Sequence, residues 1–184
     1  MCDIEMLINS TFPIIEGMLK KSGSFPLQAS AIKPDSMFTR ISTYNGAEQT
    51  SSAELITELK KAFRKKTGSY RSVAVFSNIL TVNPDTSIKT RAIEVYIEAK
   101  NEQSAYTFYY PYSMTGNRDI RYADTWSKIT RKEIFNESEA GPEIPVFIQQ
   151  PEFQDDANLS RSRRSALEKF WGRMSRPASR FTPK

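Results

Sequence analysis

The chain has 184 residues, of which 39% are hydrophobic and 26% are charged, as in an ordinary globular protein. It contains no histidine and one cysteine, Cys2, so the commonest general base, the commonest metal ligand and a disulfide framework are excluded. No apolar run approaches the roughly 18 residues of a membrane span, and the first residues are acidic where a secretory signal is basic. We therefore expect a soluble, cytoplasmic protein.

The formal net charge of +5 is unevenly distributed. Residues 160–184 contain eight basic residues and one acidic residue, a net charge of +7, which leaves −2 for the remainder. Residues 136–159 are acidic and contain three prolines, and this composition is typical of an extended connector. We predict an α+β domain at residues 1–135, a connector at residues 136–159, and a basic helix and tail at residues 160–184.

Two helices are predicted in the first 70 residues. In the first, apolar residues recur every three or four positions, and Gly23 ends the helix. Pro13 is expected either to kink this helix or to restart it with Thr11 as the cap. The second helix begins with a capping box of Ser51 and Glu54, in which each side chain satisfies a backbone N–H of the other residue, and Gly68 is expected to stop it.

Strands are predicted on both sides of the second helix. Residues 25–31 and 37–44 read as two strands joined by the turn at residues 34–36. Residues 72–82 are apolar on both faces, which indicates a central strand. Residues 93–98 alternate apolar and polar side chains as a half-buried strand does, and residues 105–112 form the next strand. Beyond Tyr112 we expect a short irregular or helical piece anchored by Trp126 and Ile129.

The predicted fold is therefore an α+β fold. Its elements follow the order α-β-β-α-β-β-β, with an antiparallel sheet of about five strands and the helices on one face. A C-terminal amphipathic helix is added to it, because four apolar residues recur at helical spacing on an otherwise basic segment. These four residues are Leu167, Phe170, Trp171 and Met174.

The first two-thirds of the chain resembles a family of small bacterial proteins of uncharacterised function. The matching stretches are residues 8–14 (INSTFPI), 18–21 (MLKK), 52–56 (SAELI) and 71–75 (RSVAV), with residues 91–93 and 111–112 at strand ends. The resemblance covers residues 4–112 and implies a bacterial origin and an α+β order. It implies no catalytic residue.

The sequence argues against a standard enzyme and predicts no cofactor. The seven glycines form no nucleotide-binding loop. Asp85, Glu98 and Lys100 imitate the signature of a metal-dependent nuclease, which requires both carboxylates on one metal ion. The residues between the two acids read as one continuous strand, and thirteen steps of about 3.3 Å would separate them by roughly 40 Å. We interpret the match as chance.

Two features are candidates for binding a protein partner. The first is a set of tyrosines on neighbouring strands, Tyr96, Tyr106, Tyr109 and Tyr110. They are interpreted either as core and cross-strand packing, which we favour, or as an exposed binding face. The second is the C-terminal helix, which has three interpretations: it covers the open face of the sheet, docks in a groove of another protein, or contacts anionic membrane or nucleic acid.

These patterns favour a non-enzymatic intracellular protein-binding module, for example an immunity-type or regulatory protein that neutralises a protein partner. The alternative is a module that its basic C-terminal helix targets to anionic membrane or nucleic acid. The two hypotheses predict different responses to salt, because binding to lipid headgroups or phosphates weakens steeply with ionic strength whereas docking of an apolar helix does not.

Overall fold

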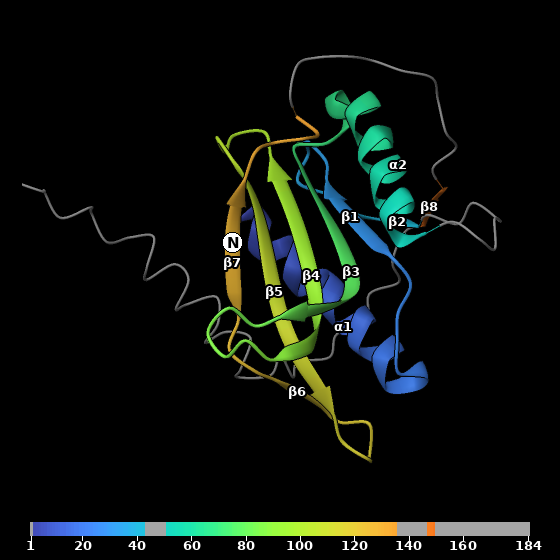
Figure 1. Cartoon of the computed structure of the whole chain (residues 1–184). Helices are drawn as coiled ribbons and strands as arrows, with labels where there is room; N and C mark the ends of the chain where they lie inside the picture. The colour runs from blue at the N-terminus through green and yellow to red at the C-terminus, as the bar shows by residue number, and fades with distance from the viewer. Residues whose placement is uncertain (1, 43–50, 136–146, 150–184) are drawn as a thin grey trace, which may run out of the picture. The chain divides into compact units, whose positions relative to one another are not determined.

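The computed structural model describes residues 2–42, 51–135 and 147–149. All of them belong to one unit, Met1–Pro151. The described residues form two helices and an antiparallel sheet, so the α+β class is confirmed (Figure 1). The predicted C-terminal helix lies outside the described residues, as does most of the predicted connector.

Helix α1, Asp3–Ser22, is one continuous helix with Pro13 inside it. Pro13 is exposed and does not end the helix. Thr11 does not act as a cap, since its hydroxyl donates to the Ser30 hydroxyl at 3.1 Å. Gly23 does end the helix as predicted, in the left-handed conformation (φ 76°) and with its N–H bound to the Leu19 carbonyl at 2.8 Å.

Helix α2, Ser52–Lys65, begins at the predicted capping box. The Glu54 carboxylate accepts the Ser51 N–H at 3.0 Å, and the Ser51 hydroxyl accepts the Glu54 N–H at 3.3 Å. The pKa of Glu54 is lowered mainly because the Ser51 hydroxyl donates a hydrogen bond to its carboxylate. The helix ends three residues earlier than Gly68, which lies in the short 3-10 turn η1, Thr67–Ser69.

The strands form one antiparallel sheet in the order β6-β5-β4-β3-β1-β2-β8, with β7 also paired to β5. Their bounds are β1 Gln28–Ile32, β2 Phe38–Ser42, β3 Ser72–Val82, β4 Lys89–Ala99, β5 Ala105–Met114, β6 Ile120–Tyr122, β7 Trp126–Thr130 and β8 Phe147–Gln149. The described residues thus form eight strands, whereas the sequence predicted about five.

Two of the additional strands correct the prediction for the chain beyond Tyr112. That region contains β6 and β7 rather than an irregular or helical piece. Trp126–Thr130 is rich in residues that favour strands, and it pairs residue by residue with the first half of β5. Ile129 is 67% exposed, so it is not an anchor. A third strand, β8, falls inside the predicted connector.

The two helices pack on opposite faces of the sheet, so the prediction that both lie on one face is wrong. Successive residues of β3 point to opposite faces. Val73 and Val75 contact a buried cluster that includes Leu59 and Phe63 of α2. Phe76, on the other face, meets Phe12 of α1 with ring centres 6.2 Å apart.

This arrangement explains why β3 is apolar on both faces. Each face is covered by its own helix, and α1 is seen behind the strands in Figure 1. Residues 73–76 are at most 3% exposed. Over this part of the sheet, α2 therefore supplies the cover that one interpretation of the sequence assigned to the C-terminal helix.

Candidate functional site

The predicted tyrosines are buried and do not gather on one surface. Tyr96, Tyr106 and Tyr109 are 7–8% exposed and Tyr110 is 3% exposed. The strand register places Tyr106 and Tyr110 on the face of α1, and Tyr96 and Tyr109 on the face of α2. Tyr110 packs edge-on against Phe12 at 4.7 Å. The packing interpretation thus describes these side chains, which leave little area for a partner. The other predicted binding residues, Leu167, Phe170, Trp171 and Met174, lie outside the described residues.

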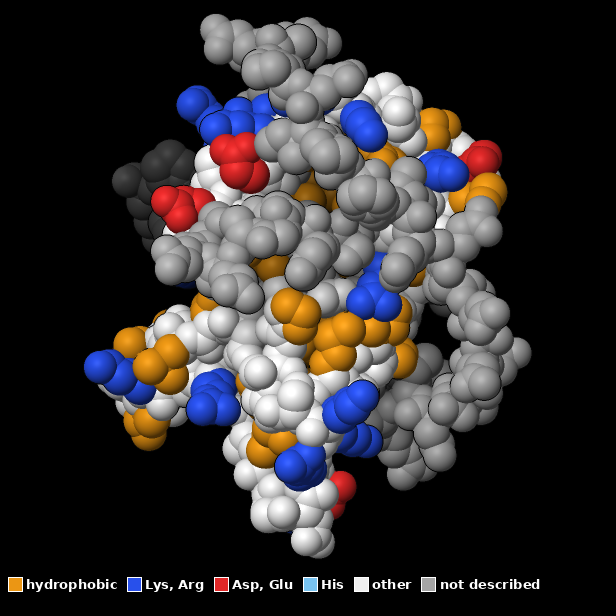
Figure 2. Space-filling model, turned by 90° about the vertical axis from the view of Figure 1, so that its right-hand side faces the viewer, with side chains coloured by type: hydrophobic (Ala, Val, Ile, Leu, Met, Phe, Trp, Pro, Cys, Tyr) orange, Lys and Arg blue, Asp and Glu red, His pale blue; other side chains and the backbone are white. Residues whose placement is uncertain are grey.

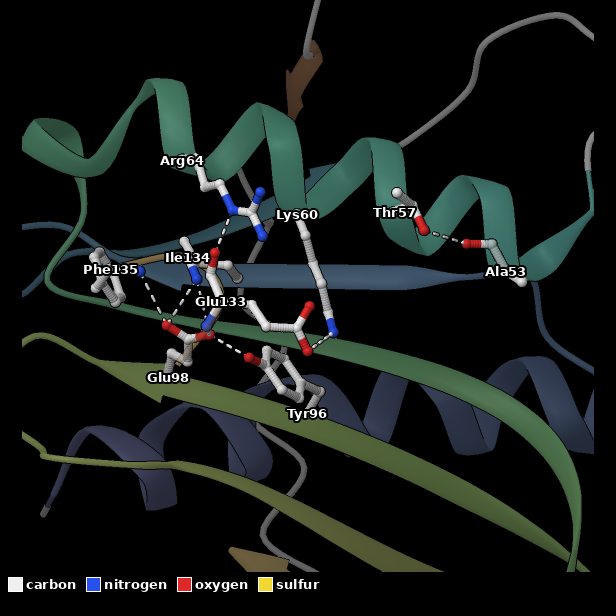
Figure 3. Close-up of polar contacts among 9 residues, drawn as sticks. All are labelled: Ala53, Thr57, Lys60, Arg64, Tyr96, Glu98, Glu133, Ile134 and Phe135. Carbon is white, nitrogen blue, oxygen red and sulfur yellow. Dashed lines mark hydrogen bonds and ion pairs between the residues drawn. The ribbon is translucent and has the colours of Figure 1, made fainter. Parts of the chain in front are cut away.

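A buried carboxylate lies at the end of β4, on the face that α2 covers. Glu98 is 0% exposed, although its place in the alternating pattern had indicated a half-buried strand. Its oxygens accept the backbone N–H groups of Glu133 at 2.5 Å, of Ile134 at 3.0 Å from each oxygen and of Phe135 at 3.0 Å (Figure 3). The hydroxyl of Tyr96 donates to the same carboxylate.

These contacts make Glu98 an anchor for the chain segment that follows β7. A carboxylate without donors is costly to bury, and four donors offset that cost here. The side chain of Ile134 is 0% exposed and belongs to the core cluster on this face. Burial is the main cause that raises the pKa of Tyr96 well above its ordinary value, and the hydrogen bond to Glu98 raises it further. Tyr96 therefore remains a neutral donor at physiological pH.

Helix α2 holds the same segment from its other side. The Lys60 ammonium lies 3.0 Å from the Glu133 carboxylate and 3.8 Å from the centre of the Tyr96 ring. The side chain of Lys60 is only 14% exposed. The Arg64 guanidinium donates to the backbone carbonyl of Glu133 (Figure 3). Residues 133–135 are thus bound to β4 and to α2 by charged groups from both.

A cleft of about 160 Å³ lies beside this network, between α2 and the sheet. Its volume is close to that of a protein cavity that holds one benzene molecule. Its polar lining comes from Lys60, Ser77, Glu94, Thr107, Thr130 and Glu133.

The carboxylates of this cleft already hold donors. Glu133 is paired with Lys60, and Glu94 accepts the Ser77 hydroxyl at 3.0 Å. The buried hydroxyl oxygen of Thr130 has no hydrogen-bond partner among the described residues. The cleft therefore offers fixed hydrogen-bonding groups to one small polar group.

The nuclease-like residues do not form a metal site. Asp85 lies in the turn before β4, and Glu98 lies near the far end of that strand. Nine strand steps from Lys89 to Glu98 correspond to about 30 Å, so one ion cannot bind both carboxylates. In the part of the chain that the structure describes, no group of three or more acids or cysteines is placed to hold a metal ion.

Three exposed, large apolar side chains lie close together at the tip of the β3–β4 hairpin. Leu80 is 69% exposed, Val82 is 50% exposed and Ile88 is 64% exposed. We name residues 80–91 the hairpin tip. Its strands remain paired from Leu80 with Arg91 to Val82 with Lys89.

The backbone of the hairpin tip separates from the neighbouring strand. The last pair between β4 and β5 joins Ala92 to Pro111, so residues 80–91 form no backbone pair with β5. Beyond this point β5 pairs with β6 instead. The sequence indicated a central strand along all of residues 72–82, but the second half of β3 is partly exposed.

The described residues carry more basic than acidic side chains. They contain 18 Lys and Arg against 13 Asp and Glu, a net charge of +5. On the face in Figure 2, basic side chains are spread over much of the surface and acidic ones occupy a few places. The net charge of −2 for residues 1–159 therefore arises because residues outside the described ranges are acidic.

Comparison of the chain with protein-family models, with curated proteins and with solved structures found no match. The helices of the described residues include none that is long and apolar enough to cross a membrane.

Proposed function

We propose that the chain is a non-enzymatic, intracellular protein-binding module that regulates or neutralises a protein partner, as immunity proteins do. The observation that supports this proposal is the hairpin tip, where three large apolar side chains are 50–69% exposed on a ribbon without a third strand. Apolar side chains gathered on a projecting element are typical of a surface that a partner covers.

The register of the hairpin gives this surface a definite chemistry. Leu80 and Val82 lie on one face of the ribbon, and their cross-strand partners Arg91 and Lys89 lie on the same face. Asn83 donates its N–H to the Ile88 carbonyl at 3.0 Å, which closes the turn beside Val82. A fitting partner has an apolar pocket with carboxylates at its rim, because the apolar contacts give affinity and the charges give orientation.

A second candidate function is favoured by the charge of the described residues. Their net charge of +5 means that the described residues do not oppose an anionic ligand of the basic residues 160–184. Nucleic acid or anionic membrane is therefore the alternative partner. Its signature is binding that falls steeply between 50 and 200 mM salt.

The experiment compares the wild-type chain with a Leu80→Ser/Val82→Ser variant. Each immobilised protein captures partners from an extract of cells that express the chain, and the captured protein is then purified and its Kd measured. We expect binding at least tenfold weaker for the variant. Met37→Ser is the matched control, since Met37 is 48% exposed in a different turn and should not matter. Equal binding by all three proteins contradicts the assignment of the hairpin tip.

A further inference from the structure

Strand β7 forms an open edge of the sheet. It pairs with β5 along Trp126–Thr130, and in the described ranges no other strand pairs with it. Ser127 and Lys128 are exposed, and Ile129 is 67% exposed. Alternate residues of an edge strand direct their N–H and C=O groups away from the sheet. In Figure 1, β7 is the outermost strand on its side of the sheet.

This edge is short and carries one lysine, but it lacks the proline and the bulge that prevent strand addition at other sheet edges. Trp126–Thr130 contains no proline and no glycine, and its five residues pair with β5 without a bulge. Threonine, tryptophan and isoleucine favour strand structure. The one charged residue within the strand, Lys128, points toward the face of α2 and lies over the ring of Tyr109 at 5.4 Å.

The charges along the edge select the kind of strand that can add. Lys128 is exposed, and Arg131 is exposed directly after the strand. Neither has a carboxylate partner among the described residues. Arg131 follows the strand, three positions after Lys128, and so does not share its face; an added strand with carboxylates at alternate positions would place one of them opposite Lys128, and such a cross-strand pair is favourable.

The same charges argue against a second copy of the chain. Two β7 strands paired antiparallel over all five residues would place Lys128 opposite Lys128, and like charges in that position are destabilising. We infer that β7 adds an extended, acidic segment of a protein partner to the sheet, by backbone hydrogen bonds along its open edge. This inference rests on the proposed protein-binding function and assigns a second contact surface, separate from the hairpin tip.

The experiment uses three fluorescent hexapeptides with the full-length protein. The probe is acetyl-Glu-Val-Glu-Val-Glu-Val-amide. The Lys-Val repeat is the charge control, and the Glu-Pro repeat keeps the negative charge but lacks half of the backbone N–H groups. We expect the Glu-Val peptide to bind at least tenfold more tightly than either control, and its binding should slow hydrogen exchange at residues 126–130. Equal binding of the Glu-Pro peptide would show attraction by charge alone and would overturn strand addition.

Two variants test the location. Lys128→Glu/Arg131→Glu should weaken the Glu-Val peptide at least tenfold, whereas Lys89→Glu/Arg91→Glu at the hairpin tip should leave its Kd unchanged. If the hairpin-tip variant weakens the peptide and the Lys128→Glu/Arg131→Glu variant does not, the assignment to β7 is overturned. A stable dimer of the chain that dissociates in the Lys128→Glu/Arg131→Glu variant would also overturn it, because a second copy would then occupy this edge.

The proposed function can fail separately from this inference. A captured protein that depends on the hairpin tip, together with no binding of the Glu-Val peptide, would retain the protein-binding function and reject strand addition. Peptide binding that Leu80→Ser/Val82→Ser does not change supports β7 as a separate surface.

Discussion

The carboxylate of Glu98 accepts the backbone N–H of Ile134 at 3.0 Å from each of its two oxygens, and neither side chain has any exposed area. The two residues are 36 positions apart, so this contact joins the end of β4 to the chain that follows β7. A hydrogen bond to a charged group is worth about 1.5–3 kcal/mol.

We therefore expect Glu98→Gln to lower the free energy of unfolding by about 3 kcal/mol, because an amide nitrogen would face backbone N–H groups. The measurement is urea unfolding followed by circular dichroism. Glu102→Gln is the control, since Glu102 is exposed and should change stability by less than about 0.5 kcal/mol. A loss below about 1 kcal/mol for Glu98→Gln would mean that the segment is not held by this carboxylate.

The contact between Lys60 and Glu133 should be stronger than an ordinary surface ion pair. Lys60 is 14% exposed and also lies over the Tyr96 ring, whereas both members of the Lys61–Glu58 pair are about half exposed. Double-mutant cycles with Ala at the lysine and Gln at the glutamate measure each coupling energy. We expect about 1 kcal/mol for Lys60–Glu133 and about 0.3 kcal/mol for Lys61–Glu58. Equal couplings would contradict the protected position of Lys60.

Stability should fall with rising pH as the buried tyrosines ionise. Burial and the nearby charge of Glu94 raise the pKa of Tyr109 to about 12, from 10 in the unfolded chain. Between pH 10 and about pH 12, the Tyr109 hydroxyl therefore keeps its proton in the folded chain and has lost it in the unfolded chain. This contribution to stability is therefore complete below pH 10 and disappears as the pH rises toward 12. Urea unfolding between pH 9 and 11.5 should show a shallower decline for Tyr109→Phe, and an unchanged slope would contradict the raised pKa.

Pro13 should limit the stability of α1. It lies inside the helix, is exposed, and removes the N–H that would bind the carbonyl four residues earlier. We expect Pro13→Ala to raise the free energy of unfolding by about 1 kcal/mol, which is part of the roughly 3 kcal/mol cost of a proline in a helix interior. Glu5→Ala, near the start of the helix, is the comparison that should not stabilise. A loss of stability in Pro13→Ala would contradict this expectation.

Removal of residues 157–184 should leave the sheet intact. Both faces of β3 are covered by α1 and α2, so the exchange rates of amides in residues 72–112 should not change after truncation at Asp156. Hydrogen exchange measured on both forms tests this expectation. Faster exchange in β3 after truncation would assign the C-terminal segment a structural role, and unchanged exchange favours a role in binding.

The features that short stretches of sequence determine were predicted well. The capping box at Ser51 and Glu54, the glycine that ends α1 and the bounds of β3 all depend on residues close together in the chain. Whether two helices share a face depends instead on contacts across the sheet, and an alternating pattern cannot report them. Glu98 illustrates the same limit, because only the arrival of Ile134 explains why a carboxylate is buried there.

The order of pairing in the sheet has a consequence for how the chain folds. Strands β3, β4 and β5 are consecutive in sequence and form two local hairpins, whereas the paired residues of β1 and β3 are 40 to 48 positions apart in the sequence. Closing such long loops costs entropy before their contacts form. The three-strand meander is therefore expected to form early, with β1, β2 and the Glu98 anchor joining later. Substitutions in the meander should slow refolding, and substitutions at the anchor should mainly accelerate unfolding.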